Sequence, residues 1–545
     1  MTTFETQDSR SEPSAASSAN AKADAVSTSV RRELRDFLRV HEQRRRQLPR
    51  SILTGLIVGL IAVAFRQTLH QAGRLREFLF ALAHAHPLWA PALPLLLGAC
   101  GAAIAVSLVR HVAPEASGSG IPHVKAVLHG TRAMRRRILP VKFFGGIAGI
   151  GGGLVMGREG PTIQMGAAVG HMVSGWFSCT LRERRTLIAA GAGAGLAAAF
   201  NAPLAGLVFV LEEVQRDFSP AVFTASLIAA AVADITTRLL LGQLPVFHVA
   251  TETIPSLMAV PFALVLGVIA ALFGVAFNRA LLVSLEVFAK IRSWKAWAVG
   301  AAVGAAVAST GFVLPAFLGG GDVLVERILS GRIAFEALVM LFLVRFVLTM
   351  LSYGTGAPGG IFAPLLMLGA ALGLAFGQGV AVWFPHAVEY PASFAAVGMA
   401  AYFSAIVRAP LTGVVLMVEM TGNYGLVLPL LAASLAAYGI ADYLKDRPIY
   451  EALLERDLLR GGENEPLEGT LLLDLVVAPG SPYDGASLAE LTLPEGCIVI
   501  LLQRGLSEEV PVASTRFVAG DRITVIVAAH ASAAVPLLHK GTGML

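Results

Sequence analysis

A charged, glycine-rich sequence, Gly-Arg-Glu-Gly-Pro at residues 157–161, provides the only Asp, Glu, Lys or Arg within residues 143–177. Ionisable residues at membrane depth are costly and usually mark an ion or proton pathway. Because Pro161 suits the first turn of a helix, we expect a chain break followed by a helix whose free N–H groups attract an anion. Glu159 would then be a tethered carboxylate that competes with a mobile anion for one site. The alternative is an ordinary turn at a membrane surface, with Arg158 and Glu159 paired in water.

The composition excludes an ordinary soluble enzyme. The chain has 545 residues, of which 55% are hydrophobic and only 14% are charged, and its mean hydropathy is +0.68. An apolar region extends from about Ser51 to about Tyr443. Since a helical span needs roughly 20 residues, this region has room for more than about ten helical segments, some too broken to cross alone. We therefore predict an all-α polytopic membrane protein.

Basic residues gather in two blocks, each bordering an apolar segment. The positive-inside rule predicts that both blocks are cytoplasmic, and we expect both chain termini on the same side. Nucleic-acid binding is the poorer interpretation, because each block directly adjoins a membrane segment. The blocks consist of Arg31, Arg32, Arg35, Arg39, Arg44, Arg45, Arg46 and Arg50, and of Arg132, Arg135, Arg136, Arg137 and Lys142.

The chain is predicted to have four parts. Residues 1–30 are polar, show no cleavable signal peptide and are expected to be a disordered cytoplasmic tail. Residues 31–460 form the membrane domain, residues 461–469 a polar linker, and residues 470–545 a small soluble α/β domain. The three cysteines, Cys100, Cys179 and Cys497, stand far apart and predict neither a disulfide framework nor a metal site.

Some element boundaries follow from local signals. Residues 30–47 are expected to form a basic helix at the membrane surface, which Pro49 ends. Residues 51–69 and 88–109 are the first two predicted spans. In the C-terminal domain, strands are expected at residues 471–477, 497–502 and 523–527.

The second half of the membrane domain repeats the pattern of the first. Pro161 and Pro364 are each followed, at the same offset, by Gly-Ala-Ala-x-Gly, and Ala-Pro-Leu precedes Glu212 and Glu419 by the same spacing. Two such pairs in the same order indicate an internal duplication, although the sequence alone does not decide whether the repeats are inverted. Transporters built from repeats place their site where broken helices of the two halves meet. Glu419 itself is expected to be a structural charge at a helix end.

Three glycine–proline breaks, at residues 118–122, 157–161 and 360–364, are each able to aim backbone N–H groups at one point. A full positive charge would hold chloride too tightly for rapid turnover, whereas partial charges from amides and hydroxyls suit it. Ser119 supplies one hydroxyl, and Tyr450 is a candidate for another. The alternative for Tyr450 is an aromatic anchor at the membrane interface.

These breaks read Gly-Ser-Gly-Ile-Pro, Gly-Arg-Glu-Gly-Pro and Gly-Ile-Phe-Ala-Pro. In sequence and order they resemble the three signature motifs of the CLC family of chloride channels and transporters. Residues 200–206, Phe-Asn-Ala-Pro-Leu-Ala-Gly, strengthen the resemblance, which covers about residues 50–455. It implies a homodimer in the lipid bilayer with one anion pathway per subunit. Each subunit would be an inverted-repeat helical bundle with broken helices.

The resemblance also implies an anion site. Ser119 and Tyr450 would hold the central chloride, the bound substrate, through their hydroxyls, and Ile361 and Phe362 would contribute backbone amides. Glu159 would be the gating glutamate, which fills the outer anion site when deprotonated and leaves it when protonated. Arg158 and Lys142 would shape the local field.

A proton pathway is implied in the same way. Glu213 would be the inner proton acceptor, with Glu212 beside it, and a glutamate at this position is associated with proton-coupled exchange rather than with channels. Ser119 is associated with selectivity for chloride over nitrate. The alternative for Glu212 and Glu213 is a solvated helix end.

The tail resembles a TrkA-C (RCK-C) domain rather than the paired CBS domains of many CLC proteins, for which it is too short. The resemblance covers residues 474–523, and its clearest mark is the Gly520-Asp521 turn before a strand. It implies a regulatory module that in some transporters dimerises and binds a ligand such as a cyclic dinucleotide. A dimerisation or stability domain without a ligand is the alternative.

We therefore expect a chloride/proton antiporter in a bacterial inner membrane, with chloride and protons as its partners and no cofactor. The alternatives are a passive voltage- or pH-gated chloride channel and a membrane sensor that signals through the tail. An enzyme is not expected, because the spans contain no His-Glu-x-x-His or Cys/His constellation.

Overall fold

The computed structural model describes residues 15–242, 257–291, 295–386, 390–460, 471–504, 507–528, 531 and 534–543. The chain divides into two compact units, Met1–Arg50 and Ser51–Leu545, which we describe separately. The first unit contains the beginning of α1 (Ala15–Ala85). Two predictions are corrected here: α1 begins within the segment predicted to be disordered, and it includes Pro49 rather than ending there. A proline removes one helical hydrogen bond but does not always end the helix.

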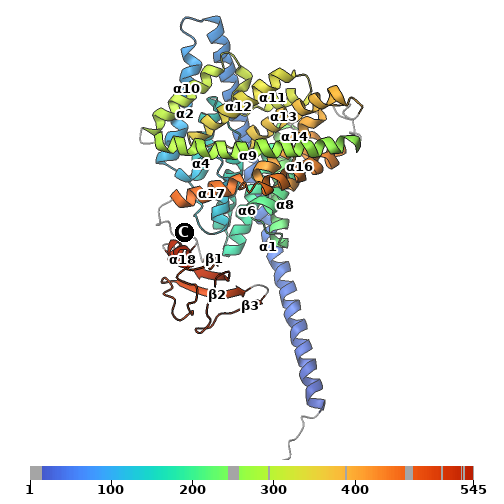
Figure 1. Cartoon of the computed structure of the whole chain (residues 1–545), viewed down its shortest axis with the longest axis vertical. Coiled ribbons are helices and arrows are strands. Elements are labelled where there is room, and N and C mark those ends of the chain that lie inside the picture. Colours follow the sequence, from blue (N-terminus) through green and yellow to red (C-terminus); the bar gives the residue numbers. More distant parts are fainter. Residues whose placement is uncertain are drawn as a thin grey trace, which may run out of the picture. The chain divides into compact units, whose positions relative to one another are not determined.

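The second unit contains a bundle of helices, many of them apolar (Figure 1). In the described part of the chain, seven helical segments are long and apolar enough to cross a membrane. They are Arg46–Ala85 of α1, α2 (Ala92–His111), α8 (Pro220–Leu241), Leu257–Ile291 with η3 (Leu257–Ala259) and α9 (Val260–Ile291), α12 (Phe335–Gly354), α13 (Phe362–Trp383), and Tyr424–Tyr443 with η5 (Tyr424–Leu426) and α16 (Val427–Tyr443). The predicted polytopic helical fold is thereby confirmed.

Shorter elements complete the bundle. The helices are α3 (Ile121–Leu128), α4 (Ile138–Gly151), α5 (Glu159–Trp176), α6 (Leu181–Phe200), α7 (Pro203–Phe209), α10 (Ala296–Thr310), α11 (Asp322–Leu329), α14 (Ser393–Val407), α15 (Pro410–Thr421) and α17 (Ile449–Arg460). Single turns are η1 (Pro114–Ala116), η4 (Pro315–Phe317) and the π-helical η2 (Val210–Val214) at the end of α7. Several of these helices begin at the glycine–proline breaks that the sequence marks.

The duplicated glycines make the same contact in both halves. A Cβ added to Gly166 of α5 would collide with the backbone oxygen of Gly191 of α6, and the reverse also holds. In the second half, a Cβ on Gly398 of α14 would collide with the backbone oxygen of Gly369 of α13. Each pair of helices therefore crosses backbone to backbone, as small residues allow in membrane bundles.

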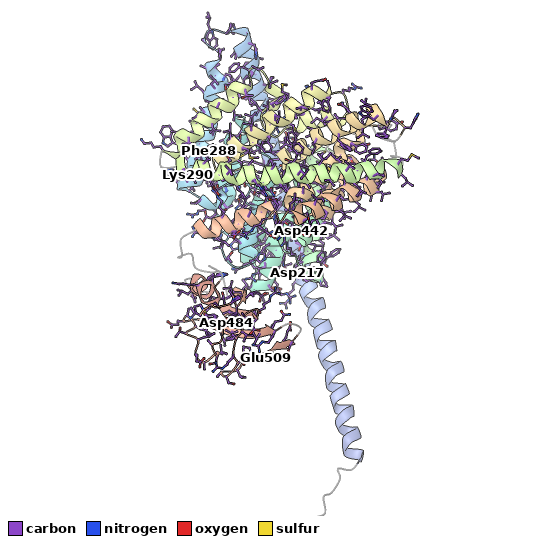
Figure 2. The ribbon with its side chains drawn as sticks, in the orientation of Figure 1. Asp217, Phe288, Lys290, Asp442, Asp484 and Glu509 are labelled. Atoms are coloured by element: carbon purple, nitrogen blue, oxygen red, sulfur yellow. The ribbon has the colours of Figure 1, made fainter. Side chains whose placement is uncertain are left out.

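The C-terminal domain is a four-stranded antiparallel sheet with one helix. The strands are β1 (Leu471–Val476), β2 (Cys497–Arg504), β3 (Ser507–Glu509) and β4 (Arg522–Val527), in the order β1-β4-β2-β3, and the helix is α18 (Ala534–Thr542). Asp484, labelled in Figure 2, accepts hydrogen bonds from the N–H groups of Gly480 and Ala519 and ties two loops together. The three predicted strands are confirmed. The sequence analysis missed β3, which is short, exposed and partly acidic, and the predicted linker lies outside the described residues.

Candidate functional site

The three glycine–proline breaks meet in space through backbone hydrogen bonds. The N–H of Gly359 donates to the carbonyl of Gly118 at 3.0 Å. Gly157 and Gly360 exchange two such bonds, at 2.7 and 2.8 Å. Segments more than two hundred residues apart in the chain are thus held side by side, and the sequence prediction that they converge is correct.

Glycine is required where these breaks touch. A Cβ on Gly160 would lie 2.9 Å from the Ser119 carbonyl oxygen, and one on Gly360 would lie 3.0 Å from the Gly160 nitrogen. The first distance is too short for a side chain, and the second would require the neighbouring backbone to shift. The close approach brings together the N-termini of α3, α5 and α13.

None of these three helices has a side-chain cap on its N-terminus. Their N-cap residues are Gly120, Arg158 and Ile361. Uncapped N–H groups carry a partial positive charge and form a ready anion site. Three such ends close together are compatible with the anion site that the sequence predicts.

Glu159, the first residue of α5, is only 1% exposed. A Cβ on Gly157 would collide with Glu159 Oε2 and lie 2.9 Å from the backbone nitrogen of Ala363. The carboxylate therefore turns toward the first turn of α13, where an anion would be stabilised. Among the described residues, Glu159 Oε2 has no hydrogen-bond partner, so no side chain locks it in this position.

Arg158 lies closer to Asp322 than to Glu159. Its Nη1 lies 3.0 Å from Asp322 Oδ2, whereas its Nε lies 3.9 Å from Glu159 Oε1. A cavity of about 440 Å³, lined by both residues and by Arg66, opens beside the glutamate. The alternative of a solvated Arg158–Glu159 pair is wrong, because Glu159 is buried.

Ser119 is also buried, at 1% exposed. Its N–H donates to the Tyr353 hydroxyl at 3.3 Å, and its Oγ accepts from the N–H of Ile121 at 3.4 Å. Lys142 donates from Nζ to the carbonyl of Gly118. Lys142 thus braces the loop that carries Ser119, which agrees with an indirect role for this lysine.

The other predicted chloride-binding residues are buried as well. Ile361 and Phe362 begin α13, and the Phe362 ring lies 4.7 Å from that of Phe403, measured between centroids. Tyr450 on α17 is fully buried, and no described residue hydrogen-bonds its hydroxyl. It lies within electrostatic range of Tyr353, Glu213 and Glu159. The alternative of an interfacial aromatic anchor is wrong for Tyr450.

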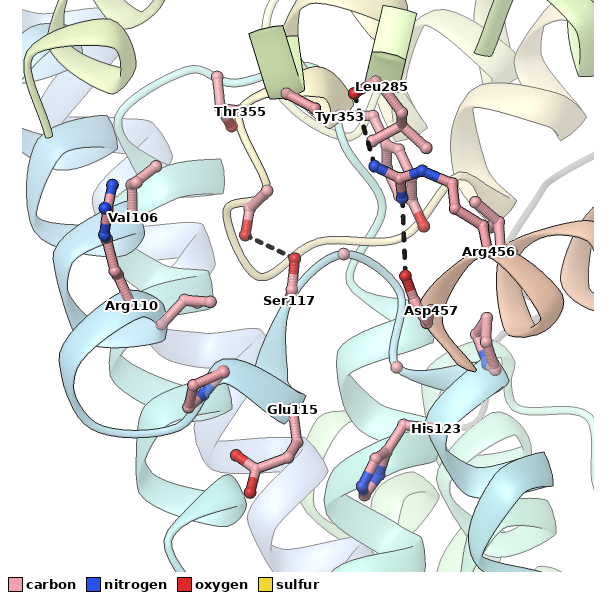
Figure 3. Close-up of a pocket in the computed structure, with 18 of the residues that line it drawn as sticks. Val106, Arg110, Glu115, Ser117, His123, Leu285, Tyr353, Thr355, Arg456 and Asp457 are labelled. Carbon is pink, nitrogen blue, oxygen red and sulfur yellow. Dashed lines mark hydrogen bonds and ion pairs between the residues drawn. The ribbon is translucent and has the colours of Figure 1, made fainter. Parts of the chain in front are cut away.

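A second cavity, of about 400 Å³, is lined by Gly118, Gly120 and Tyr353, of which Tyr353 is labelled in Figure 3. Five arginines also line it: Arg110 of α2, Arg456 of α17, and Arg132, Arg135 and Arg137 of the loop between α3 and α4. Burial alone would raise the pKa of Glu115 in its wall, but the hydrogen bonds from its own backbone and from Arg137 hold that pKa below its usual value. The lining of this cavity therefore holds more arginines than acidic residues, although Arg135 and Arg137 are paired with Glu115.

Glu213, in η2, has no exposed surface. Its Oε1 lies 2.7 Å from the Nζ of Lys125, which comes from α3. The alternative of a solvated helix end is therefore wrong for Glu213. Glu213, Glu159 and Tyr450 are all buried, and their joint role in a proton pathway stays a prediction.

Glu212 caps a helix of the other half. Its carboxylate accepts hydrogen bonds from the N–H groups of Leu411 and Thr412, at 3.0 and 2.7 Å, in the first turn of α15. Glu419 does the same for the first turn of α7, at 3.1 and 2.7 Å. The structure thus gives Glu212 a capping role, and its predicted role in the proton pathway stays a prediction. The expected structural role of Glu419 is confirmed.

Sequence analysis missed Tyr353 and Lys125. Tyr353 lies in the last turn of α12, seven residues before the third break, and no motif marks it. Lys125 is the single charged residue of the short apolar helix α3, and this isolation was a usable signal. Its partner is 88 positions away in the chain, which no local spacing reveals.

Comparisons with known proteins agree with this geometry. A family model described as voltage gated chloride channel matches residues 101–442, and a TrkA-C domain model matches residues 472–535. The H⁺/Cl⁻ exchange transporter ClcA of Vibrio cholerae is 42% identical over 408 residues, which are 73% of this chain and 87% of the relative. The corresponding ClcA of Salmonella paratyphi A is 40% identical over 414 residues, 74% and 86% of the two chains.

Solved structures show the same fold. A slow cyanobacterial Cl⁻/H⁺ antiporter superposes with a TM-score of 0.74 at 36% identity, over 76% of this chain and 98% of that one. A eukaryotic CLC transporter gives a TM-score of 0.67 at 23% identity, over 81% and 77%. At this lower identity, the similarity supports the fold alone.

Proposed function

Because the chain belongs to the voltage-gated chloride channel family, we propose that it exchanges chloride for protons across a bacterial inner membrane. The observation that carries the proposal is the position of Glu159, which is buried at the start of α5 and turned toward the first turn of α13. Relatives named as H⁺/Cl⁻ exchange transporters support the same function.

In this proposal, chloride binds where the three helix N-termini converge. Ser119 and Tyr450 contribute hydroxyl groups, and Ile361 and Phe362 contribute backbone N–H groups. Chloride reaches them from the arginine-lined cavity. Partial charges hold the ion while still allowing it to leave. Arg158 and Lys142 lie nearby, but their charged groups pair with Asp322 and with the Gly118 carbonyl.

Glu159 links the proton to the anion. Deprotonated, its carboxylate competes with chloride for the N–H groups of α13. When the carboxylate is protonated, it loses its charge and therefore its attraction to these N–H groups, so the anion site becomes free. Protons reach Glu159 by way of Glu213, which is the second buried carboxylate of the region.

We also propose a homodimer with cytoplasmic termini. Leu204 and Leu411, at equivalent positions of α7 and α15, are 50% and 51% exposed, and Leu239 of α8 and Leu435 of α16 are 76% and 55% exposed. This apolar face suits a second copy of the chain within the lipid bilayer. The TrkA-C-like domain is proposed to regulate transport, with a small anionic ligand such as a cyclic dinucleotide as one candidate.

The decisive experiment measures chloride and proton flux together in proteoliposomes under a chloride gradient. We expect uphill proton movement driven by chloride in the wild type. Glu213→Gln should reduce proton flux to background while chloride still passes, because the amide cannot accept the proton. Chloride flux without proton movement in the wild type would instead identify a channel. Proton flux that survives Glu213→Gln would exclude this residue as the acceptor.

A further inference from the structure

Lys125 places a charge deep inside the protein, one helical turn beyond the Ser119 loop. It is 3% exposed, and its Nζ lies 2.7 Å from Glu213 Oε1, with the side chains 4% and 0% exposed. Buried charges of this kind are stable only when they are paired. The two residues therefore depend on each other for their charged state.

The second carboxylate oxygen of Glu213, Oε2, does not contact Lys125 as Oε1 does. Oε2 has no hydrogen-bond partner among the described residues, and the nearest cation to it in that part of the chain is Arg216 Nη2, at 3.6 Å. The same nitrogen lies 2.5 Å from Glu451 Oε1. Arg216 is 49% exposed and Glu451 is 37% exposed, so this side of Glu213 leads toward the protein surface.

The charged and titratable groups that face Glu213 come from three elements. Lys125 lies on α3, Arg216 follows η2, and Tyr450 and Glu451 lie on α17. Helices α6 and α8 also pack against η2, but within the described residues they place no charge at ion-pair distance from Glu213. Lys125 is thus the one fully buried counter-charge of this glutamate in the described structure.

We propose that Lys125 is a positioning residue for proton exchange, which keeps Glu213 ionised between turnovers and fixes its Oε1 so that Oε2 receives the proton. The proposal rests on the proposed function, in which Glu213 is the acceptor. A proton from water on the Arg216 side forms one O–H bond at Oε2. Lys125 keeps its own proton throughout and then faces a neutral acid.

The neutral acid beside a buried ammonium is the unfavourable state of the pair. An adjacent cation favours the ionised carboxylate, and a buried charge that loses its partner is strongly destabilised. The Glu213 proton is therefore held only briefly and is released toward Glu159. Without Lys125, the buried carboxylate would keep its proton, and proton exchange would stall while chloride still passed.

The test compares Lys125→Met with Lys125→Arg in the full-length protein, using chloride and proton flux at several pH values on the Glu213 side. For Lys125→Met we expect about a tenfold loss of proton flux at pH near 7, with chloride flux within about twofold of the wild type. Raising the pH by roughly one to two units should restore proton flux. Lys125→Arg, which keeps the charge, should exchange protons like the wild type.

Two further variants keep the proposal falsifiable. If Lys125→Met does not fold, Lys125→Gln retains a hydrogen-bond donor without the charge and should show the same pH-dependent loss. The double variant Lys125→Met/Glu213→Gln should match Glu213→Gln alone, because Lys125 acts only through Glu213.

The outcomes separate this proposal from the proposed function. Normal proton flux at every pH in Lys125→Met or Lys125→Gln would overturn the role of Lys125. A loss of proton flux that no rise in pH relieves would also overturn it, since a merely structural role predicts that result. Proton flux that survives Glu213→Gln would instead overturn the assignment of Glu213.

Discussion

The two halves of the membrane domain share a scaffold but not a chemistry. In the first half, α5 crosses α6 and is followed by α7 and α8; in the second half, α13 crosses α14 and is followed by α15 and α16. The turn before α7 and the turn before α15 both contain a non-glycine residue in the left-handed region, Asn201 at φ 53° and Arg408 at φ 67°. The duplication thus preserved even local backbone geometry.

The halves also hold each other by reciprocal caps. Glu212, in the first half of the membrane domain, accepts hydrogen bonds from N–H groups in the first turn of α15. Glu419, in the second half, accepts hydrogen bonds from N–H groups in the first turn of α7. A contact that returns in both directions is the mark of a two-fold relation. The reciprocity fits the inverted repeat that the family resemblance implies.

The difference lies in two positions. Where the first half has Glu159, the second has Phe362 at the equivalent position, and where the first half has Glu213, the second has Met420. Both titratable side chains of the proposed exchange therefore belong to one half. The other half contributes the N-terminus of α13 and apolar walls.

The equivalent pair Glu159 and Phe362 gives the largest expected effect. Glu159→Gln should lower proton flux to background, because the amide neither titrates nor carries the charge that competes with chloride. Phe362→Leu should leave the ratio of proton to chloride flux unchanged, since its backbone N–H remains. Paired flux measurements in proteoliposomes test both variants.

Equal loss of proton coupling in the two variants would contradict the proposed difference between the two halves. It would show that packing around the convergence point, rather than titration, sets the coupling. Chloride flux serves as the internal control, because a misfolded protein would lose both fluxes together.

The three breaks and the duplicated offsets were readable because each is a local signal. Backbone contacts and helix starts are marked by glycines and prolines in the breaks, at residues 160, 161, 360 and 364. These residues correctly predicted that α3, α5 and α13 converge. The fold class and the short strands of the tail followed from composition and turn residues for the same reason.

Long-range partners were not readable. Nothing near Glu212 in the chain shows that its carboxylate ends at α15, about two hundred residues later, and nothing near Lys125 points to Glu213. Pro49 misled the prediction because the local rule for proline ignores the helix on either side, which continues for many turns. Side-chain pairing across a fold depends on tertiary geometry that spacing does not encode.

For the reciprocal caps, Glu212 and Glu419, we expect a smaller effect than for Glu159, and an equal loss of stability in the two halves. Glu212→Gln and Glu419→Gln should each reduce stability by about 1 kcal/mol, since a neutral amide caps a helix N-terminus less well than a carboxylate. Neither change should alter the proton-to-chloride ratio. Thermal unfolding in detergent and paired flux measurements on both variants test this symmetry.

An asymmetric result would be informative. If Glu212→Gln reduced proton flux while Glu419→Gln did not, Glu212 would carry protons as well as cap α15, and the scaffold itself would differ between the halves. Equal loss of stability without loss of coupling would limit the proton carriers to Glu159 and Glu213.

The C-terminal domain extends the comparison to a charge pair outside the membrane domain, where the expected effect is smallest. Burial alone would raise the pKa of Asp521, but hydrogen bonds from the Arg504 guanidinium, at 2.7 and 2.8 Å, and from the N–H of Val518 hold it below its usual value. A carboxylate with a lowered folded pKa stabilises the fold above its unfolded pKa of about 4, and that contribution is lost as the pH falls through the folded pKa. Because Arg504 is half exposed, Asp521→Asn should cost only about 1 kcal/mol near neutral pH.

Hydrogen exchange of β2 and β4 amides in the full-length protein measures this effect. The difference in protection between wild type and Asp521→Asn should be present at pH 6–7 and vanish only when the pH falls below the lowered pKa of Asp521, where the wild-type carboxyl is protonated too. Asp474→Asn is the matched control: Asp474 accepts one hydrogen bond from the exposed Thr524 hydroxyl, so its loss should change protection little. A difference that persists at low pH would mean that the side chain of Asp521 acts through its shape and hydrogen bonds rather than its charge. The turn before β4 would then tolerate the loss of the Asp521 charge, whereas the buried Lys125–Glu213 pair is proposed to depend on charge.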